Sequence, residues 1–252
     1  MQPARGPVPA SFAAGCAFFE KYILSLVYLY LAWREYQNAN FQPLDTLWHG
    51  PFDRLAVAQA IQHLIVTLLQ LSIGGALLLS RPPTQPPRYW RDILVPLAAA
   101  FFFLAYQIFP YLPAAWTWPF WLSGPPKPVA LLALTLALVG PAISLWGALA
   151  LGRSFGILVS VRKIVGHGPY KYVRHPIYLG YFLLWIALCL GNCSWATVVM
   201  LLVSLALLSY RAHLEETRLA ESSAEYRDYR RRTGFIFPRR RGPSLPRLPP
   251  KI

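Results

Sequence analysis

Residues 129–151 read VALLALTLALVGPAISLWGALAL, an apolar run without a charged residue. A helix needs roughly 20 apolar residues to cross the hydrocarbon core of a bilayer. This run is long enough, and the stretches at 56–80 and 93–112 have the same character. Because a segment in lipid must satisfy its backbone hydrogen bonds internally, each stretch is expected to be a helix. The fold class predicted from them is all-α, a polytopic transmembrane helix bundle.

The remaining apolar stretches are less regular. The first is interrupted by Glu20 and Lys21, so it can cross a bilayer only if both side chains lie near an interface or face protein. The other two are shorter than the roughly 20 residues that a crossing helix needs, and with them the chain has about six apolar segments. These three stretches lie at 12–33, 177–190 and 195–210.

The last two apolar segments are separated by the residues GNCS at 191–194. Gly and Asn favour a tight turn, and Ser194 is a suitable N-cap for the helix that follows. We therefore predict a helical hairpin over 177–210. Since no Gly or Pro interrupts 211–222, its second arm is expected to leave the membrane as one helix and form a cytoplasmic helical cap.

Composition and charge exclude some classes of protein. Hydrophobic residues make up 56% of the chain and charged residues 13%, whereas soluble domains carry about 25% charged residues. The net charge of +14 is compatible with nucleic-acid binding, but the Lys and Arg residues gather between apolar segments and in the tail. Basic residues beside membrane spans are typical of contact with anionic lipid headgroups, so we expect membrane lipids and no nucleic acid as partners.

The connecting loops predict the topology. The connections at 81–91 and 153–174 are basic, as is the C-terminal tail, so the positive-inside rule places all three in the cytoplasm. The connection at 113–128 carries only Lys127, and the hairpin turn carries no charge, so both are expected outside. Six crossings with both termini inside satisfy these loops, as in a multi-pass protein of a bacterial inner or equivalent membrane.

Proline-rich runs divide the chain, because proline interrupts helices and marks connections. They lie at 81–87 and 112–128. We predict an N-terminal transmembrane scaffold over 1–112 and a core that carries the motifs over 113–238. The basic tail over 239–252 is expected to be disordered.

Two stretches carry residues suited to chemistry. Residues 166–180 read GHGPYKYVRHPIYLG, and their glycines and prolines impose an irregular backbone where a basic loop enters the membrane. Such backbone is tolerated at membrane depth only inside protein or along a cavity, so we predict a polar pocket there. Residues 211–216 read RAHLEE, which places Arg211 and Glu215 on one helix face. Taken alone, that pair is equally well explained as a solvated salt bridge.

Taken together, these stretches form an ordered series. In order and spacing, the series resembles the isoprenylcysteine carboxyl methyltransferase family and the wider group of membrane phospholipid and thiol methyltransferases. The resemblance covers roughly residues 150–238. It rests on Gly-Pro-Tyr at 168–170, Arg-His-Pro-x-Tyr at 174–178, Arg-x-x-x-Glu-Glu at 211–216, Glu-Tyr-x-x-Tyr at 225–229 and Phe-Ile-Phe-Pro at 235–238.

The resemblance implies methyl transfer from S-adenosylmethionine to a lipophilic or lipidated acceptor at the cytoplasmic interface. It implies a role for Arg211 on the acceptor side, and we count Glu216 beside it as a candidate catalytic residue. One position departs from the pattern, since family members that methylate prenylated cysteine tend to carry a His at Arg162. The resemblance assigns cofactor binding to Arg162, Ile164, Val165, Tyr170, His175, Pro176, Tyr178 and Glu215, and it implies no metal.

The residue types suit this chemistry. Tyr170 and Tyr178 can offer ring faces to a sulfonium cation or an adenine, and Glu215 can accept hydrogen bonds from an amino group or a ribose. A carboxylate acceptor needs no base, but an arginine such as Arg211 can fix one of its oxygens. We favour this class of acceptor. A thiol or amine would need deprotonation, for which Glu216 or His213 are candidates.

Two alternatives remain open. Membrane sterol reductases, which use a nicotinamide cofactor, end in a similar Arg-His-x-x-Tyr region, although their size and longer C-terminal pattern fit this chain less well. A transporter or a lipid-binding membrane protein would use the basic residues for headgroup contact alone. That alternative leaves the ordered series of motifs unexplained.

Overall fold

The computed structural model describes residues 8–39, 54–104, 111–119 and 124–239. These residues contain helices and no β-strand, apart from two isolated bridges, so the predicted all-α class is confirmed. The helices, in chain order, are α1 (Ala10–Phe18), a π-helical turn η1 (Phe19–Leu24), α2 (Ser25–Asn38), α3 (Arg54–Leu78), α4 (Arg91–Phe101), α5 (Ala114–Thr117), α6 (Lys127–Leu151), α7 (Pro176–Gly191), α8 (Trp195–Ser222) and α9 (Ala224–Arg232), with 3₁₀ turns η4 (Gly152–Ser154) and η5 (Gly168–Lys171).

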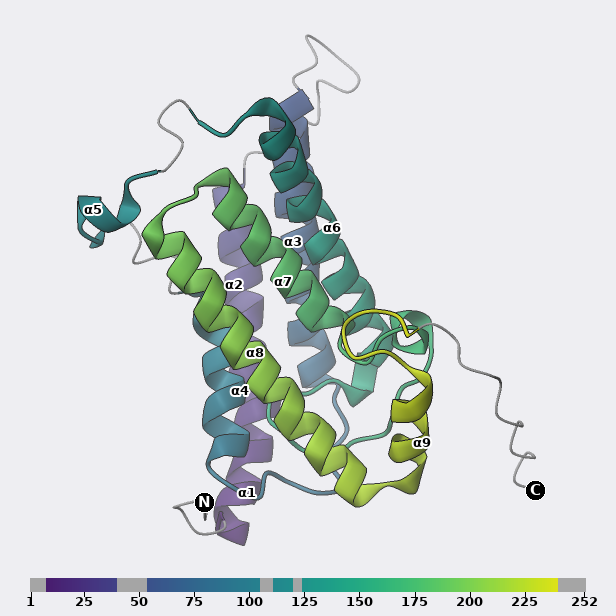
Figure 1. Ribbon diagram of the computed structural model, residues 1–252. Coiled ribbons are helices and arrows are strands. Elements are labelled where there is room, and N and C mark those ends of the chain that lie inside the picture. Colours follow the sequence, from purple (N-terminus) through teal and green to yellow (C-terminus); the bar gives the residue numbers. More distant parts are fainter. Residues whose placement is uncertain (1–7, 40–53, 105–110, 120–123, 240–252) are drawn as a thin grey trace.

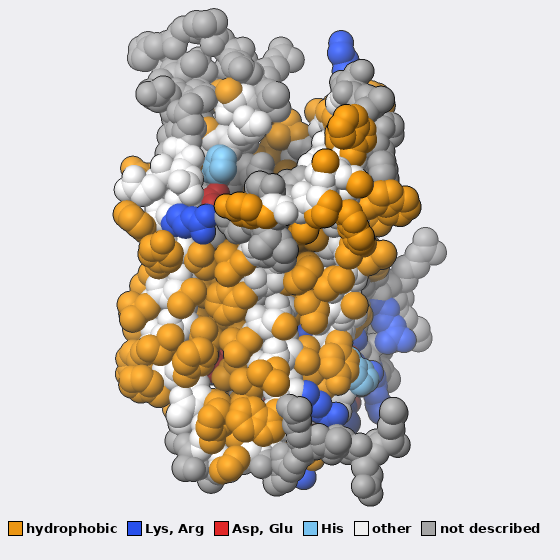
Figure 2. Space-filling view, turned by 90° about the vertical axis from the view of Figure 1, so that its left-hand side faces the viewer, with side chains coloured by type: hydrophobic (Ala, Val, Ile, Leu, Met, Phe, Trp, Pro, Cys, Tyr) orange, Lys and Arg blue, Asp and Glu red, His pale blue; other side chains and the backbone are white. Residues whose placement is uncertain are grey.

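Four helices of the described residues are long and apolar enough to cross a membrane, and α7 is a shorter apolar helix. The protein is therefore an integral, multi-pass membrane protein. Its outer surface agrees, because large apolar side chains such as Leu131, Leu149 and Leu202 are more than half exposed. Figure 2 shows hydrophobic side chains over most of one face of the bundle. Such a surface suits lipid rather than water.

The third predicted span, over 93–112, is described only in part. Helix α4 ends at Phe101 and continues as a 3₁₀ turn over 102–104, and the residues at 105–110 lie outside the described part of the chain. The tail beyond Arg239, predicted to be disordered, also lies outside it.

The chain runs back and forth between two ends of the bundle (Figure 1). The connections at 79–90 and 152–175 lie at the same end as α1 and α9, whereas the hairpin turn and the start of α6 lie at the other end. The two basic connections predicted to share the cytoplasmic side therefore do share one end.

Helices α6 and α7 pack against each other through small residues. A Cβ built on Gly180 would lie 2.1 Å from the Ser144 Oγ atom and 2.3 Å from the Gly140 carbonyl oxygen. The Ser144 hydroxyl donates a hydrogen bond to the Ile177 carbonyl at 3.0 Å. Close backbone approach through small residues is a common way for helices to associate in lipid. This contact fixes the start of α7, where the candidate site lies.

The predicted hairpin is confirmed, and α8 extends without interruption from Trp195 to Ser222. Its N-cap is Ser194, as expected. The Ser194 Oγ atom accepts a hydrogen bond from the Thr197 amide, and the Thr197 hydroxyl accepts one from the Ser194 amide at 2.9 Å. This reciprocal pair satisfies amide groups that the first turn of a helix leaves without a partner.

Replacement of Ser194 by alanine removes the side-chain acceptor and is expected to lower the stability of the protein by about 1 kcal/mol. The measurement is the free energy of unfolding in detergent. Ser222→Ala serves as the control, because that hydroxyl donates only to the Leu219 carbonyl near the end of the same helix. Equal losses in both variants would contradict a specific capping role.

Candidate functional site

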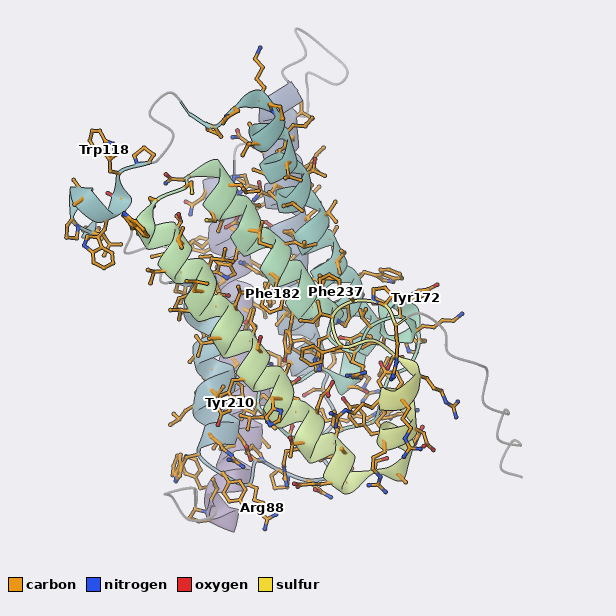
Figure 3. The ribbon with its side chains drawn as sticks, in the orientation of Figure 1. Arg88, Trp118, Tyr172, Phe182, Tyr210 and Phe237 are labelled. Carbon is orange, nitrogen blue, oxygen red and sulfur yellow. The ribbon has the colours of Figure 1, made fainter. Side chains whose placement is uncertain are left out.

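A cavity opens at the basic end of the bundle. The empty space in the cavity is about 1090 Å³, a volume that includes open solvent at its mouth. The wall is formed by the 152–175 connection, the first half of α7, the last third of α8, and α9. Figure 3 shows a dense group of side chains in this region, with the labelled Tyr172 and Phe237 beside the start of α7.

The C-terminal segment holds the loop before α7 in place. The Arg174 amide donates to the Gly234 carbonyl at 2.9 Å, and the His175 amide donates to the Phe235 carbonyl at 3.2 Å. Pro176 then begins α7 at a position where its missing amide proton costs nothing. Gly168 has a φ of +59°, a conformation that favours glycine. The irregular backbone predicted here is therefore present, and it lines the cavity at Tyr170, Arg174 and His175.

Three side chains from α7 and α8 form a connected group inside the cavity. The Tyr178 hydroxyl donates to Glu215 Oε1 at 2.5 Å, and Arg211 Nε donates to the same oxygen at 3.0 Å. Arg211 Nη2 also donates to the Ile157 carbonyl at 2.8 Å, and the guanidinium lies over the Tyr178 ring at 5.2 Å. The Nη1 atom of Arg211 has no hydrogen bond among the described residues, so its donors are available to a ligand.

The second carboxylate of the pair, Glu216, points to a different set of partners. Its Oε1 atom accepts from Arg174 Nε at 2.5 Å and lies 3.3 Å from His175 Nε2. Its Oε2 atom lies 3.2 Å from Arg230 Nε. Glu216 is buried and does not line the cavity. It therefore ties the start of α7 to α9, whereas Glu215 faces the cavity.

His175 connects these two groups. Its ring stacks on Tyr178, with centroids 5.2 Å apart and planes 7° apart. Its Nδ1 atom lies 3.9 Å from Glu215 Oε2, on the side opposite its contact with Glu216. The stacked ring therefore fixes the orientation of Tyr178.

Tyrosines outside the spans close the outer part of the cavity. Burial raises the pKa of Tyr229 to about 12. Burial, reinforced by the nearby Glu215 carboxylate, raises the pKa of Tyr170 well above its ordinary value. Both phenols therefore stay neutral at pH 7. The Tyr229 hydroxyl donates to the Tyr170 carbonyl at 2.7 Å, which connects α9 to the loop before α7.

Sequence reasoning missed Glu20 as part of the site. It was treated only as an interruption of the first span, yet its carboxylate contacts Arg162 Nη2 at 2.6 Å. The signal was present, because an ionisable residue in an apolar span is a functional candidate by default. Arg174 was recognised as part of the Arg-His-Pro-x-Tyr motif but was given no role of its own. Lining residues from the N-terminal helices, such as Tyr28, had no recognisable sequence signal.

The predicted site residues are mostly brought together. All but two of them line the cavity, and the two that do not are Pro176 and Glu216. His213, the other candidate base, is exposed on α8 and does not line the cavity either. Within the described part of the chain, no group of three or more His, Cys, Asp or Glu residues could hold a metal ion.

Comparison with known proteins gives three findings. The model of the isoprenylcysteine carboxyl methyltransferase (ICMT) family matches residues 132–221. The nickel-cobalt-cadmium resistance protein NccN of Alcaligenes xylosoxydans xylosoxydans is 34% identical over 122 residues, which are 47% of this chain and 53% of NccN. A solved structure of the eukaryotic intramembrane Ras methyltransferase ICMT shows a TM-score of 0.40 and 19% identity, over 90% of this chain and 97% of that one.

The family match confirms the resemblance predicted from the sequence, over less than half of the chain. The segment at 132–221 is isoprenylcysteine carboxyl methyltransferase-like, and it contains α7 and α8 together with most of the cavity wall. The alignment with NccN spans about half the length of that relative.

Proposed function

We propose that this isoprenylcysteine carboxyl methyltransferase-like membrane protein transfers a methyl group from S-adenosylmethionine to a lipophilic carboxylate. One observation carries the proposal. Arg211 lines a cavity that has both polar and apolar side chains in its wall, and its Nη1 atom makes no hydrogen bond among the described residues. An arginine among such residues suits an acceptor with an anionic group on an apolar body.

The polar wall fits the cofactor in three respects. Glu215 Oε2 is free of the hydrogen bonds that occupy Oε1 and can accept from an amino group. Arg162 lines the cavity, and its guanidinium suits a carboxylate. The rings of Tyr170 and Tyr178 suit a sulfonium cation or an adenine. When bound, S-adenosylmethionine supplies an electrophilic methyl group.

The apolar wall fits the rest of the acceptor. It is built from the interior of the bundle, with Tyr28 from α2, Ile73 from α3, Ala100 from α4, and Ile177 and Tyr181 from α7. In this proposal the N-terminal helices therefore shape the acceptor side of the cavity. The predicted boundary at residue 112, between scaffold and core, separates segments without and with motifs, but both segments contribute to one site.

The residues then act by positioning and by electrostatics. Arg211 holds one acceptor oxygen through Nη1, and its contacts to Glu215 and Ile157 keep the guanidinium in one orientation. A carboxylate is already a nucleophile at pH 7, so no proton needs to be removed. This agrees with the placement of Glu216, which is engaged by Arg174, His175 and Arg230. We assign Glu216 a positioning role for the start of α7.

The proposal includes the orientation of the protein. We place the basic end of the bundle, with the cavity mouth, in the cytoplasm, because Lys and Arg residues are retained on that side. The cofactor then enters from the cytoplasm, and the acceptor enters from the bilayer. Anionic headgroups are expected to contact the same end.

Calorimetric binding of S-adenosylhomocysteine to the detergent-purified protein tests the cofactor. We expect Glu215→Gln to weaken binding by about tenfold to 100-fold, because a hydrogen bond to a charged group is lost. Glu35→Gln is the matched control, since Glu35 lies outside the cavity lining and contacts His63 at 2.7 Å. Folded protein that binds NADPH but not S-adenosylhomocysteine would replace this proposal with the reductase alternative, and binding of neither would favour a non-enzymatic role.

A further inference from the structure

A buried carboxylate in the first span contacts the wall of the cavity. Glu20 is 2% exposed, although it lies in a helix that is long and apolar enough to cross a membrane. It belongs to the π-helical turn η1, between α1 and α2. Short π-helical segments in an otherwise α-helical span are frequent at functional sites. Glu20, Leu24 and Tyr28 lie four residues apart on one face of this span, and each is at most 3% exposed.

The Glu20 carboxylate accepts hydrogen bonds from backbone amides that belong to no helix. Its Oε1 atom accepts from the Ile157 amide at 2.5 Å and from the Leu158 amide at 2.9 Å. Its Oε2 atom contacts Arg162 Nη2 at 2.6 Å. The carboxylate therefore fixes the irregular segment that follows η4, whose amides would otherwise be buried without a partner.

The same segment holds Arg211 from the opposite side. The Leu158 amide donates to Glu20, while the Ile157 carbonyl, which belongs to the same peptide group, accepts from Arg211 Nη2 at 2.8 Å. Hydrogen bonds in such a chain polarise one another. Glu20 on the first span is thus connected through one peptide group to the arginine that faces the acceptor.

The packing of Arg162 against Gly156 also restricts the irregular segment that precedes Ile157. The Arg162 guanidinium lies flat against Gly156, where an added Cβ would approach Arg162 Nη1 to 1.8 Å. Arg162 Nη1 also donates to Ser160 Oγ at 2.5 Å. Arg162 therefore covers the segment before Ile157, and Glu20 neutralises the charge that this placement buries. Removing one partner of such a pair leaves an uncompensated buried charge.

We infer that Glu20 is a positioning residue for Arg211, acting through the Ile157 backbone, so that the N-terminal span takes part in the reaction. The inference rests on the proposed function. It extends the site to a part of the chain outside the segment that matches the methyltransferase family, which begins at residue 132.

Two variants separate positioning from folding. Glu20→Ala removes the acceptor for both amides, and we expect it to lower kcat about 100-fold, the cost of a misplacement of roughly 1 Å. Glu20→Gln retains an oxygen for the amides and should recover most of this loss. The reaction is transfer from radiolabelled S-adenosylmethionine to N-acetyl-S-farnesylcysteine, with Glu35→Ala as the control carboxylate on the same span.

Two further readouts keep the test decisive. Hydrogen–deuterium exchange over 155–162 should be fast in Glu20→Ala and slow in Glu20→Gln. In an Arg211→Lys background, Glu20→Ala should lower kcat little further, because both changes disturb one interaction. If Glu20→Ala does not fold, Glu20→Asp replaces it, with an expected loss of about tenfold.

The outcomes are distinct. An active wild-type protein whose kcat is insensitive to Glu20→Ala would overturn the inference and leave the proposed function intact. If the loss in kcat of the double variant equals the product of the losses of the two single variants, the inference is also overturned, since Glu20 would then act independently of Arg211. A folded wild-type protein with neither cofactor binding nor methyl transfer would instead overturn the proposed function.

Discussion

Arg211→Lys is expected to lower methyl transfer to a farnesylcysteine acceptor about 1,000-fold, the upper range for loss of one preorganised electrostatic contact. Lysine keeps the charge but not the planar fork of donors. The wild-type guanidinium contacts Glu215, the Ile157 carbonyl and the Tyr178 ring together. A single ammonium group cannot hold these partners and an acceptor oxygen at once, so the acceptor loses its fixed position.

The measurement is kcat and KM with radiolabelled S-adenosylmethionine, together with the dissociation constant of S-adenosylhomocysteine. Cofactor affinity should remain within about threefold. Loss of a charged contact to the cofactor would instead lower the affinity about tenfold or more, which corresponds to the free energy of one pKa unit. Arg227→Lys is the matched control, because Arg227 is exposed on α9 and donates only to the Ala220 carbonyl. Turnover by Arg211→Lys at the wild-type rate would remove Arg211 from the proposed mechanism.

Gly180→Ala is expected to prevent stable folding, at a cost of about 3 kcal/mol or more. The added methyl group would meet the Gly140 carbonyl oxygen at 2.3 Å and the Ser144 amide nitrogen at 3.0 Å. These are backbone atoms of α6, so the two helices must separate. Separation would also break the hydrogen bond from Ser144 to Ile177 and displace the start of α7, which carries His175 and Tyr178.

The yield of monodisperse protein and its melting temperature in detergent measure this effect. Gly75→Ala is the control with identical chemistry, because a Cβ on Gly75 meets nothing within 4 Å. That change should leave the melting temperature the same or raise it slightly, since alanine is the better helix former. Equal behaviour of the two variants would show that the α6–α7 contact is not close-packed in the membrane.

Much of the fold could be predicted because, in a bilayer, helix formation depends mainly on residues close together in sequence. An apolar run of sufficient length must be helical in lipid, whatever else the chain does, and α3, α6 and the α7–α8 hairpin follow from that rule. Ser194 was recognisable as a cap because capping depends on neighbouring residues. The end of the third span is left open by composition, since apolar residues alone do not say where a helix ends.

The pairing of Arg211 with Glu215 could be predicted in the same way, since residues four apart on a helix are neighbours. The family resemblance added which loop would lie beside them. Neither could say that Glu215 faces the cavity while Glu216 is tied to Arg174, because adjacent helix positions differ by a third of a turn and only packing decides which one faces inward.

The sequence by itself determined the helices, the hairpin and the local Arg211–Glu215 pair, because each depends on residues within a few positions of one another. Only the tertiary structure decided that Glu20 reaches Ile157 and that Tyr178 reaches Glu215. These contacts join parts of the chain far apart in sequence. They depend on how the helices cross, which no local pattern specifies.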